Sequence, residues 1–317
     1  MKLVHTSVMV EEVLHFLAPT HRSSLLIDCT VGEGGHAEAF LHSFPDLRIV
    51  GIDADGSILQ IACDRLRPFG DRFQGIESWY DEFFSRYPLN ERPDRILFDL
   101  GISSYHYERS GRGFSFSREE PLDMRLSATV PQTAMDLVNT LGESELTDLF
   151  YKWGEERWAR KIARALIQYR QTSRFSSAKQ LAEVIRQAVP AKARYGRLHP
   201  ATRCFQALRI SVNAELERLN RALPSAFELL KEEGRMGVIS FHSLEDRIVK
   251  HFFKKQTRGS MGEDELPISN SKGVGAKLVT RKPIRPNKVE VKNNPASRSA
   301  KLRVIEKILR EGQYAEV

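Results

Sequence analysis

The sequence has few cysteines and no long hydrophobic run. Its three cysteines, Cys29, Cys63 and Cys204, are too scattered for a disulfide framework, and no Cys-x-x-Cys pair is present for zinc. No segment approaches the ~20 apolar residues that a membrane-spanning helix needs. Two acidic residues end the apolar patch at 8–10 before it reaches the length of a signal-peptide core. The sequence therefore predicts a cytoplasmic protein with no metal site and no membrane partner.

Acidic residues are scarce in the second half of the chain. Residues 1–150 hold 13 basic and 24 acidic side chains, whereas residues 151–317 hold 35 and 17. Between Arg157 and Arg209 there are 13 Lys or Arg and one acid, with aromatic residues interleaved. Residues 247–258 hold five further Lys or Arg and no acid. Phosphate contacts and aromatic stacking bind RNA, so this pattern favours an RNA partner. The alternative is two ordinary solvated surfaces of opposite sign.

Short apolar segments alternate with helical stretches in the first hundred residues. Three of them end in an acid, namely Asp28, Asp53 and Asp99. This alternation is typical of a parallel, doubly wound sheet, in which ligands bind at the carboxyl ends of the strands. Residues 236–241 and 299–309 predict further strands.

The remaining segments set the expected domain boundaries. Residues 109–205 show only helical patterning, so we expect an inserted helical domain, with residues 1–108 and 206–317 forming one discontinuous α/β domain. A long helix is predicted from about 205 to 231, bent or restarted at Pro224. Residues 254–294 predict a loop.

A glycine cluster follows the first predicted strand. Gly34 and Gly35 permit a tight turn and a close approach of a ligand to the next helix N-terminus. Asp53 lies 19 residues beyond Gly34, where a carboxylate accepts hydrogen bonds from ribose hydroxyls. The loop lacks the full G-x-G-x-x-G pattern and carries no cation, but NAD and S-adenosylmethionine both remain open at this point.

Three more residues are placed around such a cofactor. His36 and Asp99 suit the polar methionine end of S-adenosylmethionine, and Tyr80 is placed either to pack on adenine or in the core. Asp99 is also the candidate to accept the proton of an exocyclic amine during methyl transfer, with helix capping as the alternative. His242 follows a later strand and is a second candidate at the reacting end. The candidate RNA contacts are Arg197, His199, Arg203, Arg247 and Arg298.

Ten blocks together resemble one family. They are His5-Thr6-Ser7-Val8, Gly34-Gly35-His36, Gly51-Ile52-Asp53, Asp99-Leu100-Gly101-Ile102-Ser103-Ser104, Arg112-Gly113-Phe114-Ser115-Phe116, Pro121-Leu122-Asp123-Met124-Arg125, Gly154-Glu155-Glu156-Arg157, His199-Pro200-Ala201-Thr202-Arg203, Phe241-His242-Ser243-Leu244-Glu245-Asp246-Arg247, and the stretch from Asn294-Pro295 to Arg303. In this order they resemble the ribosomal RNA small-subunit methyltransferase H family, also called MraW, which methylates N4 of a cytidine in 16S rRNA.

The resemblance implies a Rossmann-like methyltransferase with an inserted all-helical domain, S-adenosylmethionine as the methyl donor and 16S rRNA of the small subunit as the partner. The implied cofactor contacts are Gly34, Gly35, His36, Asp53, Tyr80, Asp99 and His106. The sequence departs from the family at His106, where Gln is usual, and at Tyr80, where Phe is common. The alternatives are an RNA-binding assembly factor with a vestigial cofactor site, and a methyltransferase for another RNA or a small molecule. A homodimer is compatible with the sequence, which does not decide the oligomeric state.

Overall fold

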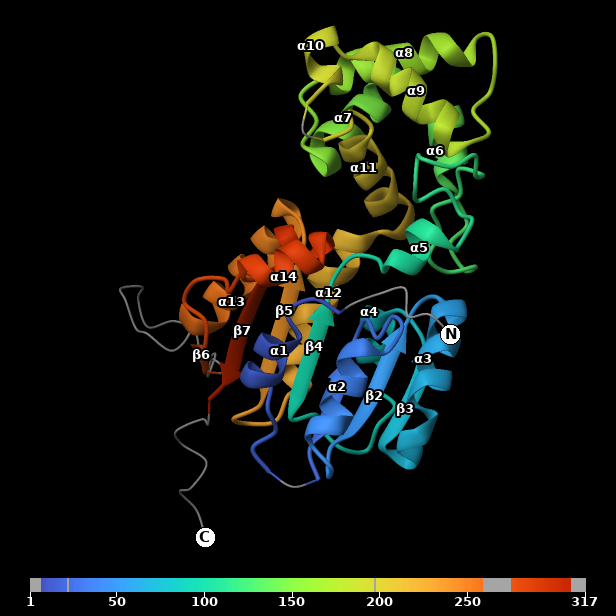
Figure 1. Ribbon diagram of the computed structural model, residues 1–317. Helices are drawn as coiled ribbons and strands as arrows, with labels where there is room; N and C mark the ends of the chain where they lie inside the picture. Colours follow the sequence, from blue (N-terminus) through green and yellow to red (C-terminus); the bar gives the residue numbers. More distant parts are fainter. Residues whose placement is uncertain (1–6, 22, 197, 259–274, 309–317) are drawn as a thin grey trace. The chain divides into compact units, whose positions relative to one another are not determined.

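The computed structural model describes residues 7–21, 23–196, 198–258 and 275–308. The chain divides into two compact units: unit 1 comprises Met1–Gly101 and Leu216–Val317, and unit 2 comprises Ile102–Glu215 (Figure 1). The boundaries expected from the sequence, at 108/109 and 205/206, lie seven and ten residues from these. Each unit is described here by itself.

Unit 1 is built on a seven-stranded sheet in the order β3-β2-β1-β4-β5-β7-β6. The strands are β1 (Leu25–Asp28), β2 (Arg48–Asp53), β3 (Phe73–Glu77), β4 (Arg95–Asp99), β5 (Arg235–Ser240), β6 (Ala276–Leu278) and β7 (Lys301–Lys307). The first five are parallel, and β7 runs antiparallel to both β5 and β6. The predicted Rossmann-like α/β fold is confirmed.

Helices cover both faces of this sheet (Figure 1). They are α1 (Val10–Phe16), α2 (Gly35–Ser43), α3 (Gly56–Leu66), η1 (Arg67–Arg72), α4 (Tyr80–Arg86), α12 (Glu215–Leu229), α13 (Ser243–Arg258), α14 (Lys288–Asn293) and η2 (Pro295–Ser299). Side chains of α1, α2 and α3 form one hydrophobic core with the sheet, and those of α4, α12 and α13 form the other. Strands β1, β2, β4 and β5 are buried along most of their length, which explains why they read as short apolar runs in the sequence.

Unit 2 is helical in its named elements. These are α5 (Ser104–Glu108), α6 (Ala134–Thr140), α7 (Glu143–Gly154), α8 (Ala159–Arg170), α9 (Ala178–Ala188), α10 (Ala191–Arg194) and α11 (Thr202–Asn213). Helix α7 packs against α8 and α11, and α8 packs against α9. Among the described residues, none of the helices is both long enough and apolar enough to cross a membrane.

Two predictions about the second half of the chain are wrong. The helix expected from 205 to 231 is interrupted at Ala214, which has a left-handed φ of 50°, while α12 continues through Pro224. A left-handed residue turns the chain and ends the helix. Pro224 removes one backbone donor inside α12 without ending that helix. The segment 254–294 is not simply a loop, since α13 extends into it and β6 and α14 lie within it. These last two elements are too short to show a period in the sequence.

Candidate functional site

The carboxyl ends of β1, β2 and β4 bring three acids to one edge of the sheet. In the parallel register, Asp28 of β1 pairs with Gly51 of β2 and with Leu97 of β4. Asp53 and Asp99 end the two neighbouring strands. These are the strand ends at which doubly wound sheets bind their ligands.

The glycine loop between β1 and α2 turns through left-handed residues. Gly32 has φ 54° and Gly34 has φ 81°, values that favour glycine. The Gly34 N–H donates to the Val31 carbonyl at 2.8 Å, and α2 begins at the next residue. A side chain at Gly35 would place its Cβ 2.0 Å from the Ser7 hydroxyl oxygen, so the N-terminal segment lies directly on the loop.

Asp53 joins the glycine loop to the end of β2. Its Oδ2 accepts a hydrogen bond from the Gly32 N–H at 3.0 Å, and its Oδ1 accepts one from the Asp55 N–H at 3.0 Å. The Val31 N–H donates to the Ile52 carbonyl at 2.9 Å. The carboxylate predicted to bind ribose therefore also fixes the shape of the loop.

His36, in the first turn of α2, lies between two of the strand-end acids. Its side chain is buried, and Nε2 lies 3.3 Å from Oδ2 of Asp99. The Asp99 N–H donates to the Thr30 hydroxyl at 2.8 Å, which fixes the strand end. Oδ1 of Asp99 is buried and has no hydrogen-bond partner among the described residues. A buried carboxylate oxygen without a partner is costly, so it marks a place where a ligand would complete the contact.

Burial and charge shift the pKa values in this cluster. Burial raises the pKa of Asp28 to about 7; His36 and the Thr30 N–H oppose the rise, while Asp99 and Asp53 add to it. Burial alone would lower the pKa of His36, but its contact with Asp99 and the nearby acids outweigh burial and raise it. Perturbed titratable groups around one imidazole are typical of a functional site.

An aromatic pair follows β3. Tyr80 is the first residue of α4, and its ring stands edge-on to Phe98 of β4, with centroids 5.5 Å apart. The neighbouring Trp79 is 6% exposed, and the guanidinium of Arg218 lies 3.9 Å from its ring centroid. The indole N–H of Trp79 is buried without a partner in the part of the chain that the structure describes. The ring of Tyr80 is therefore held beside β4 by its contact with Phe98.

His242 follows β5, at the same edge of the sheet. Its Nε2 lies 3.0 Å from Oε1 of Glu245, whose Oε2 accepts the Phe241 N–H at 2.8 Å. The imidazole is therefore held in place at the start of α13.

Three of the other predicted residues belong to unit 2. His106 belongs to unit 2, where it is buried with its ring edge-on to Phe114 at 5.4 Å. His199 is exposed and stacks on Phe116 with centroids 4.5 Å apart; burial lowers its pKa, as does the charge of Arg186. Arg203 is exposed and donates to the Glu155 carbonyl at 2.8 Å.

Of the remaining predicted RNA contacts, Arg247 and Arg298 are exposed in unit 1. Arg197 lies outside the described residues.

Sequence reasoning missed several residues around the loop. Asp28 was noted only as a strand end, although its place in the same pattern as Asp53 and Asp99 was a usable signal. Glu290 gave no signal: its Oε1 accepts the Met9 N–H at 2.6 Å across 281 residues of sequence. Its charge also contributes to the raised pKa of His36.

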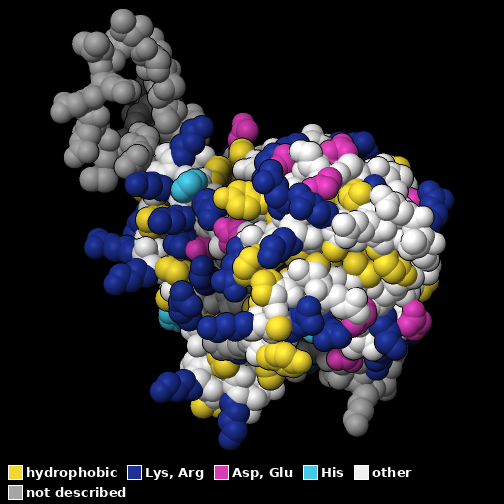
Figure 2. Space-filling view, turned by 90° about the horizontal axis from the view of Figure 1, so that it is seen from above, with side chains coloured by type: hydrophobic (Ala, Val, Ile, Leu, Met, Phe, Trp, Pro, Cys, Tyr) yellow, Lys and Arg dark blue, Asp and Glu magenta, His cyan; other side chains and the backbone are white. Residues whose placement is uncertain are grey.

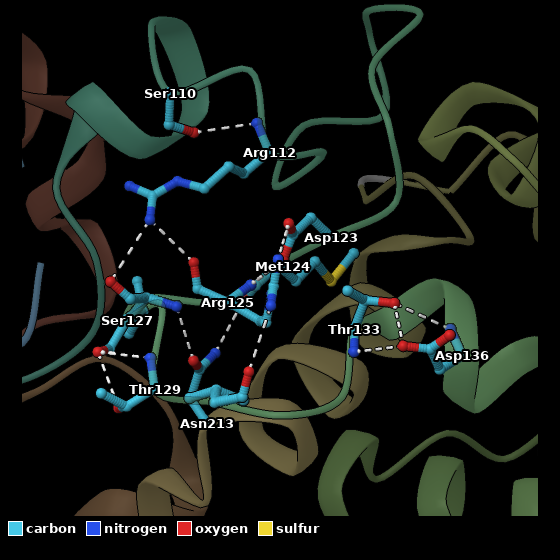
Figure 3. A network of polar contacts seen from close by, with 12 residues as sticks. Ser110, Arg112, Asp123, Met124, Arg125, Ser127, Thr129, Thr133, Asp136 and Asn213 are labelled. Carbon is cyan, nitrogen blue, oxygen red and sulfur yellow. Dashed lines mark hydrogen bonds and ion pairs between the residues drawn. The ribbon is translucent and has the colours of Figure 1, made fainter.

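Unit 2 contains a polar network that fixes two of the sequence blocks (Figure 3). Asn213 Nδ2 donates to the Met124 carbonyl at 2.8 Å, and its Oδ1 accepts the Leu126 N–H at 2.8 Å. Arg112 donates to the Arg125 carbonyl at 2.9 Å. Met124 has a left-handed φ of 60°, a strain that persists only because these contacts determine the loop. Such rigid, strained loops are frequent at binding sites.

Comparison of the sequence with known proteins finds relatives from one family. The sequence profile of the MraW methylase family matches residues 2–308. The ribosomal RNA small subunit methyltransferase H of Treponema denticola is 50% identical over 97% of this chain and 98% of its own length. The protein of the same name from Syntrophobacter fumaroxidans is 43% identical over 96% and 97%. Among solved structures, an rRNA methylase from Streptococcus thermophilus covers 95% of this chain and 96% of its own at 12% identity, with a TM-score of 0.43, too low to support any conclusion.

Proposed function

Because the chain belongs to the MraW methylase family, we propose that it transfers a methyl group from S-adenosylmethionine to N4 of a cytidine in 16S rRNA of the small ribosomal subunit. The names of the relatives support the rRNA substrate. The choice of N4 of a cytidine rests on the resemblance of the ten sequence blocks. The proposed place of action is the cytoplasm, where small subunits are assembled.

The observation that carries the proposal is the acidic edge beside the glycine loop. S-adenosylmethionine bears a positive sulfonium and an ammonium group, and the buried Asp28 and the partly buried Asp99 suit a cation. The loop at 29–36 lacks the full G-x-G-x-x-G pattern of dinucleotide-binding loops, and it carries no Lys or Arg. The residues present therefore fit S-adenosylmethionine better than NAD.

Each predicted cofactor residue has a role in this proposal. The backbone at Gly34 and Gly35 allows close approach of the cofactor, and Asp53 accepts the ribose hydroxyls while holding Gly32. Tyr80 packs on adenine, and His36 and Asp99 receive the methionine end. His106, in unit 2, is the remaining family position. When bound, S-adenosylmethionine supplies the electrophilic methyl group.

Asp99 is the proposed catalytic residue. The amine of cytosine is a weak nucleophile because its lone pair is delocalised into the ring, so orienting it and accepting its proton is most of the task. The partnerless Oδ1 of Asp99 is a suitable acceptor, since the other oxygen is occupied by His36. His242 contacts the substrate base at the neighbouring strand end. The cytidine must leave any base pair to reach this edge.

The proposed RNA contacts involve both units. We assign RNA recognition to the helical insertion, residues 109–205. This insertion interrupts the discontinuous methyltransferase domain, which comprises residues 1–108 and 206–317. The contacts are Arg197, His199, Arg203, Arg247 and Arg298.

The test uses labelled S-adenosylmethionine and small subunits from a strain that lacks this methylation. Wild-type protein is expected to give N4-methylcytidine on nucleoside analysis, and another product would reject the proposal. Asp99→Asn should lower the methylation rate at least 100-fold while calorimetry still detects cofactor binding. Asp71→Asn, an exposed acid on η1, is the matched control and should retain the wild-type rate. Full activity of Asp99→Asn would remove this carboxylate from the mechanism.

A further inference from the structure

Helix α13 exposes a row of cationic side chains along one side, of which only Arg247 is among the RNA contacts proposed above. The exposed residues are Arg247, Lys250, His251, Lys254 and Lys255. At 3.6 residues per turn, they fall within an arc of about 140°. Val249 and Phe253, on the opposite side, are buried in the core of unit 1. No acid occurs between 247 and 258, and the two acids of the helix, Glu245 and Asp246, lie in its first turn.

The segment 281–298 exposes a second group of cations. They are Arg281, Lys282, Arg285, Lys288, Lys292 and Arg298. The segment holds a single acid, Glu290, whose carboxylate accepts the Met9 N–H at 2.6 Å. Glu290 thus has a structural partner, and its one charge does not balance six exposed cations.

Both groups adjoin strand β7. Asp246, in the first turn of α13, binds Lys301 and Arg303 of β7, each at 2.8 Å. Ile284 pairs with Leu302 through an isolated bridge. Because Asp246 is already engaged by two cations, it leaves the row on α13 positive. In Figure 2, Lys and Arg side chains gather on the left of the view, with few Asp or Glu side chains among them.

We propose that these cations, here called the β7-flanking cations, bind the phosphate backbone of the substrate RNA, so that the catalytic unit itself anchors the RNA. This inference rests on the proposed rRNA substrate. Strand β7 begins at Lys301, opposite Ser240 at the carboxyl end of β5. Arg247 and Arg298 are close in sequence to these two residues. RNA held by these cations therefore approaches the edge of the sheet at which Asp99 lies.

The chemistry of the surface favours RNA over a lipid membrane. A helix that binds membranes inserts an apolar side chain row into the bilayer. The apolar side of α13 is instead packed in the core, through Val249 and Phe253. A group of exposed cations without an apolar row suits the repeated phosphates of a polynucleotide.

The test compares two triple variants of the full-length protein. Lys250→Gln, Lys254→Gln and Lys255→Gln together remove three of the β7-flanking cations. The matched control, with Arg67, Arg86 and Arg92 all changed to Gln, removes three exposed cations from segments around β3 and β4. Binding to small subunits is measured between 0.05 and 0.3 M salt, and cofactor affinity by calorimetry.

The α13 variant should bind small subunits roughly 10- to 50-fold more weakly at 0.15 M salt, with the slope of log K against log salt smaller by about 2, since each lost contact removes ~0.7. Cofactor affinity should stay at the wild-type value, and the control should bind RNA normally. Wild-type RNA binding by the α13 variant, or an equal loss in the control, would overturn the inference and leave the proposed function standing. Loss of binding to phosphatidylglycerol vesicles with unchanged RNA binding would assign the surface to a membrane. Failure of the wild-type protein to methylate or bind small subunits would instead reject the proposed function, and this inference with it.

Discussion

Replacing Asp28 by Asn should make unit 1 more stable above neutral pH. The side chain is 1% exposed, and burial raises its pKa from the ordinary 3.8 to about 7. Between these two pH values the unfolded chain has lost the proton and the folded protein keeps it. Stability therefore falls as pH rises through this window, because the folded protein must finally bury a carboxylate. Asn keeps the shape and an oxygen that accepts the Thr30 N–H, but it cannot ionise.

The size of the effect follows from the shift. At ~1.4 kcal/mol per pH unit, a rise from 3.8 to about 7 corresponds to about 4 kcal/mol over the full window. From pH 5 to pH 8 the part lost by the wild type is about 3 kcal/mol. Asp28 also helps to raise the pKa of His36. His36 contributes stability that is lost as pH rises through its folded pKa, so removing Asp28 reduces this loss too and acts in the same direction.

The assay isolates unit 1 with a single tryptophan. The sequence contains Trp79, Trp153 and Trp158, and the last two lie in unit 2, so changing both to Phe leaves Trp79 as the reporter. Urea unfolding at pH 5 and pH 8 then gives the free energy of unfolding of each variant. Asp28→Asn should remove about 3 kcal/mol of the pH dependence, whereas the exposed Asp71→Asn should remove none. An unchanged pH dependence in Asp28→Asn would refute the assignment of this proton to Asp28.

Three further predictions concern packing and binding. Gly35→Ala should weaken cofactor binding in calorimetry, because its Cβ would lie 2.0 Å from the Ser7 hydroxyl oxygen and Ser7 must shift on the loop, whereas Gly196→Ala meets nothing closer than 3.6 Å and should bind normally. Asn213→Ala leaves buried backbone groups of unit 2 without partners and should lower its unfolding free energy by about 3 kcal/mol, monitored by the tryptophans of unit 2 with cofactor affinity unchanged. In the single-tryptophan protein, S-adenosylmethionine should change the fluorescence of Trp79, which adjoins the proposed adenine site; no change at saturating cofactor would place adenine elsewhere.

The acidic strand ends could be read from the sequence because their signal is local. Each of these strands is largely buried, so it appears as a short apolar run, and its last residue is an acid at the edge where doubly wound sheets bind ligands. Asp53 and Asp99 were found in this way. Their contacts were not, since the hydrogen bond from Gly32 to Asp53 and the contact of His36 with Asp99 depend on how three strands are aligned.

Contacts distant in sequence, and short elements, account for what could not be predicted. The bond between Met9 and Glu290 spans 281 residues, and neither residue carries a pattern that indicates the other. The helix break at Ala214 also has no signal in the sequence, because alanine normally favours a helix and only the surrounding structure holds it at a positive φ. Pro224, ten residues later, was the visible sequence signal for a helix break, but α12 continues through it.

The uneven distribution of charge along the sequence does not follow the division of the chain into two units. Cutting the chain at residue 150 suggested an acidic part for the cofactor and a basic part for RNA, yet the acidic strand ends and the β7-flanking cations both belong to unit 1. The two charges therefore lie at different positions along one sheet: the acids at β1, β2 and β4, and the cations beside β7. Acids near the cofactor attract its positive groups and repel RNA phosphates, whereas the cations hold those phosphates. If RNA is anchored beside β7, only an extruded base needs to extend across β5 to reach Asp99 on β4, and the phosphate backbone stays away from the acids. In the proposed arrangement, the catalytic unit therefore has a physical reason to select an unpaired base.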